Sequence, residues 1–342
     1  MAAAKIALIT DTIVTTKDFF DCLLVNQDSF FVSEISQLDI GVIALFGSQD
    51  NDSGPYENSE NMLLVEELDT YPWTLEMTQD METLLNDADF VICQLRHADE
   101  KKSLRFIDHL CREMERFCPD VWLINYSKHI GIVSQCIQDN FTIKSVGISD
   151  TPQTLLRLVK DYFGEDATME YIGMENHGYV TSIKDGGGME LKDKLLFPKK
   201  DSELDRIKQD KSGFDALEEI GALPTAYLMQ IIQMEDAKLF ANQHNTWYKE
   251  PINRPLEHQN SVIEIMDAIY NQYPCVHIVY TPNNGALKFL EDSDVVEIAA
   301  HIGREGILPM SVEFFDNHYI IERMISNKII ERSCIENRMN SK

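Results

Sequence analysis

Strand-like segments recur along the first half of the chain, at residues 5–9, 88–95, 121–124 and 143–148, and the segment at 121–124 is an unbroken apolar run bounded by polar residues. Unbroken runs of this length are typical of strands that are buried on both faces of a parallel sheet. Between the second and third runs, residues 99–117 place apolar side chains at the spacing of an amphipathic helix. The alternation of strand and helix patterns predicts an α/β fold with a Rossmann-like, doubly wound parallel sheet.

The second half of the chain also carries strand and helix patterns, in a mixed order. Strand-like runs are predicted at 169–173, 179–183, 275–280 and 294–302, and helical spacing at 154–163, 224–248, 261–270 and 314–331. The glycines at 186–188 follow no parallel strand and open no helix, so we expect a hairpin turn there rather than a phosphate loop. These patterns predict a Rossmann-like domain over residues 1–152 and a mixed α/β, substrate-type domain over residues 153–342.

Polar residues follow two of the predicted parallel strands. Asn125 and Ser127 come after the run at 121–124, and Ser149 and Asp150 come after the run at 143–148. The carboxyl ends of neighbouring parallel strands meet at one edge of the sheet, where open α/β sheets bind their ligands. A small-molecule site is therefore expected at this rim.

The charge of the chain narrows the choice of partners. Its 342 residues carry 57 Asp and Glu against 30 Lys and Arg, a net charge of −27. Nucleic acid and anionic membranes need a basic surface, so neither is expected as a partner. The apolar N-terminal stretch is too short for a signal peptide or a membrane span, and the seven scattered cysteines form no C-x-x-C pair. Together these features predict an acidic, cytoplasmic protein with reduced thiols.

Three blocks of sequence together resemble one enzyme family. They are residues 118–127, CPDVWLINYS; residues 221–228, GALPTAYL; and residues 279–310, VYTPNNGALKFLEDSDVVEIAAHIGREGILPM. Their order and spacing resemble glycoside hydrolase family 4, whose α-glucosidases, α-galactosidases and 6-phospho-glycosidases use NAD and a divalent metal. The resemblance implies the fold of lactate and malate dehydrogenases. It also implies a reaction in which NAD oxidises the sugar, a base removes a proton, and the glycosidic bond breaks by elimination.

The cofactor loop of that family is changed in this chain. A glycine-rich turn should follow the first strand, and the matching positions include Thr10, Asp11 and Thr12. Side chains there obstruct the approach of the backbone to a pyrophosphate, and the Asp11 carboxylate repels its charge. Asp39, which we expect to end the second strand, stands where such folds bind a ribose, and it equally fits a strand-end cap. We therefore expect no cofactor, whereas an active protein would need NAD and Mn²⁺.

The metal and base positions of the family also differ. By resemblance, the metal cysteine falls on Ser149 and the metal histidine near His177, with Asp150 alongside. A serine hydroxyl is a far poorer ligand than a thiolate, so a polar rim without metal is the alternative to a site of hard ligands. The family's base tyrosine falls just after His258, on amide side chains that cannot remove a proton. His258 and Asp150 are the catalytic candidates that remain, although a charge ahead of a helix explains His258 equally well.

Four further residues are candidates for binding a substrate. Lys128 and Arg254 are cations suited to an anionic group, while Asn125 and Asn283 belong to the first and third family-like blocks. Relative to the family, the chain also runs directly from residue 97 into a helix without the family's long insertion, and we expect its second domain to be truncated at the C-terminus.

Two hypotheses on function remain open. The first is a pseudo-enzyme that has lost the NAD- and metal-dependent reaction and binds a small anionic or sugar ligand, or a protein partner, in the old cleft. The second is a divergent glycosidase, 6-phospho-glycosidase or other enzyme, in which Asp150, Glu175, His177 and His258 do acid–base or metal work. A dehydrogenase on the same fold would need the missing glycine loop. A homo-oligomer is expected in each case.

Overall fold

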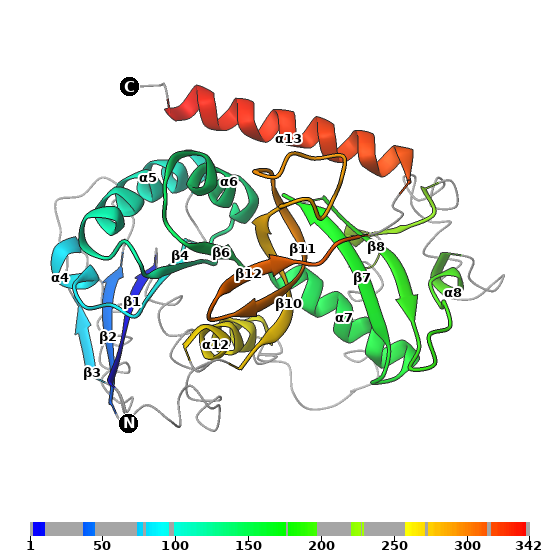
Figure 1. Ribbon diagram of the computed structural model, residues 1–342, viewed down its shortest axis with the longest axis horizontal. Helices are drawn as coiled ribbons and strands as arrows, with labels where there is room; N and C mark the ends of the chain where they lie inside the picture. The colour runs from blue at the N-terminus through cyan, green and yellow to red at the C-terminus, as the bar shows by residue number, and fades with distance from the viewer. Residues whose placement is uncertain are drawn as a thin grey trace, which may run out of the picture.

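The computed structural model describes residues 3–10, 37–44, 74–77, 80–95, 99–175, 177–196, 220–226, 228, 257–270, 273–312 and 316–339. The described strands form one mixed sheet in the order β3-β2-β1-β4-β5-β6-β10-β11-β7-β8-β9, with β12 paired to β11. Figure 1 shows this sheet passing through the whole molecule, with helices on both of its sides.

The first half of the chain builds the parallel part of the sheet. Its strands are β1 (Ala3–Thr10), β2 (Gln37–Ala44), β3 (Thr74–Met77), β4 (Phe90–Gln94), β5 (Trp122–Asn125) and β6 (Ser145–Gly147). All neighbours among them pair in parallel, and their order 3-2-1-4-5-6 is that of a doubly wound nucleotide-binding fold. The Rossmann-like parallel sheet that the apolar runs predict is therefore confirmed.

The second half extends this sheet with antiparallel strands. These are β7 (Thr168–Met174), β8 (His177–Lys184), β9 (Leu223–Pro224), β10 (Cys275–Pro282), β11 (Val295–Gly303) and β12 (Gly306–Pro309). The junction is the pairing of Tyr280 in β10 with Gly147 in β6. The sheet thus continues from one half into the other, and the division at residue 152 stays a prediction.

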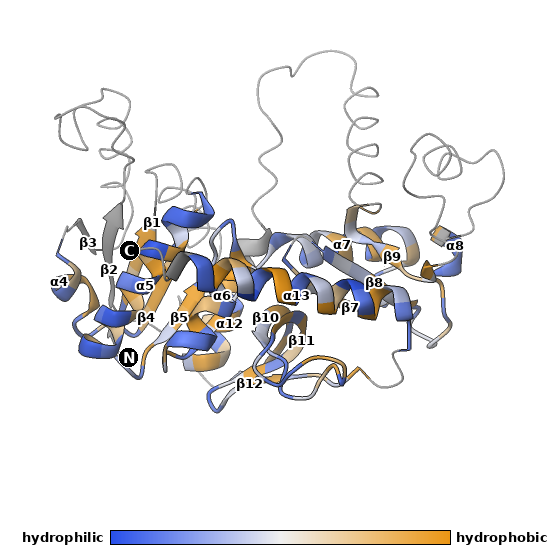
Figure 2. Cartoon of the chain, turned by 90° about the horizontal axis from the view of Figure 1, so that it is seen from above, coloured by the Kyte–Doolittle hydropathy of each residue, from blue (hydrophilic) through white to orange (hydrophobic). Residues whose placement is uncertain are grey.

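Helices cover both faces of the sheet, which makes a three-layered α/β molecule. The helices are α4 (Met81–Leu85), α5 (Glu100–Phe117), α6 (Ile130–Asn140), α7 (Asp150–Phe163), α8 (Asp193–Leu196), α12 (Glu257–Tyr270) and α13 (His318–Met339). In Figure 1, α5, α6 and α13 lie above the sheet, and α12 and α7 lie below it. In Figure 2 the strands of the centre are mostly hydrophobic in colour, whereas the outer surfaces of α4 and α5 are hydrophilic.

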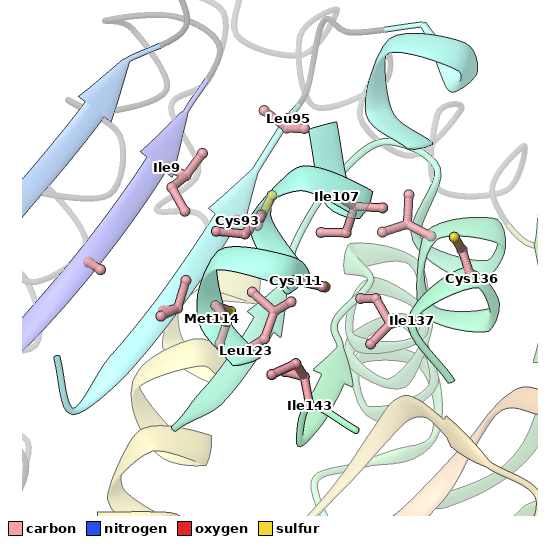
Figure 3. Close-up of a cluster of buried hydrophobic side chains, with 14 of the residues drawn as sticks. Ile9, Cys93, Leu95, Ile107, Cys111, Met114, Leu123, Cys136, Ile137 and Ile143 are labelled. Carbon is pink, nitrogen blue, oxygen red and sulfur yellow. The ribbon is translucent and has the colours of Figure 1, made fainter. Parts of the chain in front are cut away.

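Alternate residues of the parallel strands feed two separate cores. On one face, Ile6 and Ile92 pack in a cluster with Met266 of α12. On the other face, Ile9 and Cys93 pack with the inner sides of α5 and α6, as Figure 3 shows. Full burial of one such aliphatic side chain contributes roughly 1.5–3 kcal/mol. Because both faces are covered, the strands read as unbroken apolar runs rather than as alternating ones.

Local sequence explains where the helices α5 and α7 begin. Asp99 caps α5, since its side chain accepts a hydrogen bond from the Lys102 N–H at 2.8 Å, and the predicted helix at 99–117 is confirmed. Helix α7 begins at Asp150 and not at residue 154 as predicted, because Pro152 is tolerated in the first turn of a helix. Ser149 is its N-cap and Gly164 its C-cap.

The structure places Asp39 within its strand. Asp39 is the third residue of β2, which continues to Ala44, so the expectation that Asp39 ends this strand is wrong. Its backbone lies toward the amino end of the strand, about five residues, or roughly 16 Å, from the rim where a ribose would lie.

The glycines at 186–188 do form a tight turn, closed by the Gly188 N–H donating to the Asp185 carbonyl at 2.8 Å. No helix among the described residues has the length and apolarity needed to cross a bilayer.

Candidate functional site

A cleft of about 560 Å³ opens at the carboxyl ends of β5 and β6. The two polar loops that the sequence places at one rim do meet there: Ser127 and Lys128 line it from the loop after β5, and Ser149 and Asp150 from the loop after β6. The opposite wall comes from β7, β8, β10 and β11. The volume is within the range of roughly 300–1,000 Å³ that small-molecule sites occupy.

Asn125 shapes the loop between β5 and α6 from below. It is fully buried, its Oδ1 accepts from the Ser127 N–H at 3.2 Å, and its Nδ2 donates to the Ser134 hydroxyl at 3.0 Å and to the Ile130 carbonyl at 3.2 Å. Its amide is thus engaged within the protein and does not line the cleft. Asn125, a candidate for binding the substrate, therefore supports the residues that line the cleft.

Two glycines make room for a tyrosine beside the cleft. A Cβ at Gly178 would overlap the Tyr171 hydroxyl, and a Cβ at Gly173 would lie 2.8 Å from the same oxygen. Since real Cβ atoms do not approach other atoms so closely, only glycine fits at both positions. The space they leave is filled by Tyr171, which lines the cleft and is buried.

Glu297 is the most deeply buried acid of the cleft. It is only 2% exposed, and its Oε2 accepts a hydrogen bond from the Tyr171 hydroxyl at 2.5 Å. Burial raises its pKa to about 7, while the hydroxyls of Tyr171, Ser149 and Tyr280 oppose this rise. The neighbouring carboxylate in turn helps burial to hold the pKa of Tyr171 well above its usual range. Near neutral pH this carboxyl group can therefore either keep or release a proton.

Glu175 occupies the start of helix α6. Its Oε2 accepts from the backbone N–H of Gly131 at 2.6 Å and from that of Ile132 at 3.4 Å, where the helix dipole favours negative charge. Burial nevertheless raises the pKa of Glu175 to about 7, helped by the nearby carboxylate of Glu331. The chain thus supplies its own anion at a position that could otherwise bind one.

The loop after β6 is similarly engaged. The Ser149 hydroxyl caps α7 by accepting from the Thr151 N–H at 3.3 Å, and Asp150 accepts a hydrogen bond from the Tyr126 hydroxyl. On the other side of the cleft, His177 places its Nδ1 2.8 Å from the carbonyl oxygen of Glu175, to which it donates. These contacts fix the rim without any bound group.

The residues described at the rim do not fit the metal ion that the resemblance implies. Among them, no three His, Cys, Asp or Glu side chains converge in a way that could hold an ion. Ser149 offers a neutral hydroxyl already used as a helix cap, where thiolate or carboxylate would bind Mn²⁺ more strongly. Ser149 and His177 both line the cleft, but they lack the third ligand that such a site needs.

The remaining predicted residues divide into three groups. Lys128 lines the cleft from an exposed position, whereas Asn283 is buried away from it, accepting from the Leu287 N–H at 2.7 Å and holding the turn after β10. Thr10 and His258 are placed by their backbones alone, at the end of β1 and at the second position of α12. Asp11, Thr12 and Arg254, and nearly all of the helix predicted at 224–248, lie outside the described residues.

Sequence reasoning gave no role to the buried glutamate and tyrosines of the cleft. Glu297 sits inside the apolar stretch of β11, between the fully apolar Val296 and Ile298. A carboxylate in a buried strand is costly unless other groups compensate its charge. A glutamate within an apolar strand pattern therefore indicates a candidate site residue. The tyrosines that contact it, Tyr171 and Tyr280, come from β7 and β10, the two strands that flank β11, so their contact with Glu297 depends on sheet pairing.

Comparison with known proteins identifies one family. The family model described as family 4 glycosyl hydrolase matches residues 98–165, and that of the family 4 glycosyl hydrolase C-terminal domain matches residues 153–337. A 6-phospho-beta-glucosidase of Escherichia coli (strain K12) is 22% identical over 309 residues, which cover 70% of this chain and 68% of that protein.

Solved structures agree on the fold. A 6-phospho-beta glucosidase from Thermotoga maritima, determined with manganese, NAD+ and glucose-6-phosphate, has a TM-score of 0.71 at 14% identity, with 98% of this chain and 90% of that chain covered. A lactate dehydrogenase from a Medee basin deep-sea metagenome library has a TM-score of 0.61 at 14% identity, with 99% and 100% covered. The predicted likeness to the lactate dehydrogenase fold is confirmed.

Proposed function

Because the chain belongs to family 4 of the glycosyl hydrolases, we propose that its cleft binds a sugar without running the NAD- and metal-dependent reaction of the family. The protein is then a pseudo-enzyme on a glycosidase scaffold. A protein partner and a homo-oligomeric state stay predictions that accompany this function.

One observation carries the proposal: the side chains that would bind the metal are engaged within the chain. The Ser149 hydroxyl caps α7, and Asp150 accepts a hydrogen bond from Tyr126. Glu175 accepts from two backbone amides of α6. Recruiting the oxygens that accept these bonds to an ion would weaken the bonds, and each bond to a charged group contributes about 1.5–3 kcal/mol.

The lining of the cleft favours a sugar as the ligand. Its volume of about 560 Å³ admits a small polar molecule. Tyr126, Tyr171 and Tyr280 present aromatic bodies with polar tips, and the carboxyl groups of the lining accept hydrogen bonds from ligand hydroxyls. Polar groups placed in this way give orientation and specificity to a bound molecule that is rich in hydroxyls.

Titration calorimetry tests this function on the full chain. We expect a saturable heat when glucose is added, and none when NAD or MnCl₂ is added. Ser149→Ala is the informative variant. If this serine serves only as a helix cap, its removal costs about 1 kcal/mol in stability and leaves the heat measured on addition of MnCl₂ unchanged. Saturable Mn²⁺ binding that Ser149→Ala weakens would overturn the proposal.

One observation favours a second candidate, a divergent acid–base enzyme. Glu175 and Glu297 both line the cleft, and burial raises the pKa of each to about 7. Two carboxyl groups poised near neutral pH are suited to donating and accepting protons in catalysis. The matched replacements Glu175→Gln and Glu297→Gln would each then lower turnover of a glycoside at least a hundredfold. Turnover that survives both replacements would remove this candidate.

A further inference from the structure

The described lining of the cleft carries three carboxyl groups and one lysine. Among the described residues that line it, Asp150, Glu175 and Glu297 are carboxylates, and Lys128 is an exposed lysine at the same rim. A sugar phosphate would bring further negative charge among these carboxylates. Like charges that share a site of low dielectric repel each other strongly.

The strongest donors of the cleft are already used on its own carboxylates. The Tyr171 hydroxyl donates to Glu297, and the Tyr126 hydroxyl donates to Asp150. The amides at the start of α6, which would suit a phosphate, donate to the carboxylate of Glu175. A phosphate group would have to displace one of these internal anions.

One buried oxygen in the cleft has no hydrogen bond. Glu297 is 2% exposed, yet its Oε1 accepts no well-formed hydrogen bond from any described residue, although the hydroxyls of Ser149 and Tyr280 lie near this carboxyl group. A buried polar atom of this kind destabilises the fold unless a donor reaches it. Because Glu297 lines the cleft, that donor can come from a ligand.

We propose that the ligand is an amino sugar or a similar aminated polyol, whose ammonium group donates to Glu297 Oε1 beside Glu175. This inference rests on the proposed function, since it names the ligand class of the same cleft. The ammonium group supplies the missing donor and places a positive charge between the carboxyl groups of Glu297 and Glu175, whereas the lysine of the lining, Lys128, lies exposed at the rim. The ring hydroxyls of the sugar donate to the remaining acceptors.

Ligand charge is the variable that separates this inference from its alternatives. The probes are glucosamine, glucose and glucose 6-phosphate, titrated calorimetrically into the full chain at about pH 7, where a sugar amine is mostly protonated. We expect glucosamine to bind about tenfold or more tightly than glucose, the factor of one charge-assisted hydrogen bond in a buried site. Glucose 6-phosphate should bind more weakly than glucose.

Two variants locate the preference. Glu297→Gln keeps the acceptor for the Tyr171 hydroxyl but removes the charge, so glucosamine and glucose should then bind within about twofold of each other. Glu165→Gln, at a side chain that is 87% exposed beyond the end of α7, is the matched control and should keep the full preference. If Glu297→Gln does not fold, Glu175→Gln gives the same readout, with the preference reduced.

The outcomes distinguish the inference from the function on which it rests. Tighter binding of glucose or glucose 6-phosphate than of glucosamine would leave a sugar-binding cleft and overturn the amino-sugar class. A glucosamine preference that both glutamate variants retain would overturn the role of these carboxylates. If none of the three probes binds, the proposed function itself fails.

Discussion

Replacing Glu297 by glutamine should change how the stability of the protein depends on pH. In the folded chain this carboxyl group is buried, and its pKa is raised from the ordinary 4.5 to about 7. The folded state therefore keeps a proton that the unfolded chain releases above pH 4.5. The stability that the protonated Glu297 carboxyl group contributes is complete below about pH 4.5. It is lost as the pH rises to about 7, because the folded state must then bury a charge.

The size of this effect follows from the pKa. A rise from 4.5 to about 7, at ~1.4 kcal/mol for each factor of ten, corresponds to ~3 kcal/mol of unfolding free energy. Glutamine is neutral at every pH and can still accept from the Tyr171 hydroxyl. The variant should thus stay within about 1 kcal/mol of the wild type near pH 5 and exceed it by ~3 kcal/mol near pH 8.

Urea denaturation of both proteins at several pH values between about 5 and 8.5 measures this difference. Glu165→Gln serves as the control, because its side chain is exposed and its replacement should leave the pH dependence unchanged. Parallel stability curves for the wild type and Glu297→Gln would refute the reasoning, since they would mean that Glu297 ionises in the folded chain as easily as in water.

Two further substitutions test the packing that supports the cleft. Gly178→Ala should destabilise the fold by roughly 2–4 kcal/mol, because its Cβ would overlap the Tyr171 hydroxyl, whereas Gly303→Ala, with no atom within 4 Å of its new Cβ, should cost far less. Thermal melts of the two variants compare them, and equal melting temperatures would contradict the clash. Lys328→Met should cost about 3 kcal/mol near pH 8, because it leaves the buried carboxylate of Glu331 without the lysine that it contacts. The cost should shrink as the pH is lowered, because burial raises the pKa of Glu331 and protonation removes the unpaired buried charge; a cost that does not depend on pH would count against a buried charge as its cause.

The parallel sheet could be predicted because burial on both faces leaves a plain mark on the sequence. The run at 121–124 reads as apolar because its strand is covered by helices above and below. The same reasoning placed Ser127 and Ser149 at one rim, because parallel strands share the direction of their carboxyl ends.

Boundaries were harder to predict than elements. Asp39 was expected at the end of its strand because a charged residue usually interrupts an apolar run, yet β2 continues for five more residues beside β1. The sequence pattern predicts the start of α7 at residue 154, four residues too late, because Pro152 resembles a helix breaker. The first turn of a helix needs no N–H from a proline, so the helix can begin before Pro152.

The electrostatics of the cleft lay beyond sequence reasoning. The contact of Glu175 with the first amides of α6 joins residues that are 44 positions apart, and that of Tyr171 with Glu297 joins residues 126 apart. No local pattern encodes such pairs, because they arise only when antiparallel strands of the second half pair with one another beside the parallel sheet. The hydrogen bonds of the metal-site candidates Asp150 and Glu175 likewise join residues distant in the sequence, so no local pattern predicts them.

The release of nitrophenol from nitrophenyl glucosides tests the central claim most directly. The full chain is incubated with NAD and MnCl₂ and with the glucoside in its α and β forms, each with and without a 6-phosphate. The account predicts no release above that of the protein-free blank in any combination, because the described residues around Ser149 include no three side chains that could together hold a metal ion. Release that requires both NAD and Mn²⁺ and saturates with substrate would show an active family 4 glycosidase and contradict the account.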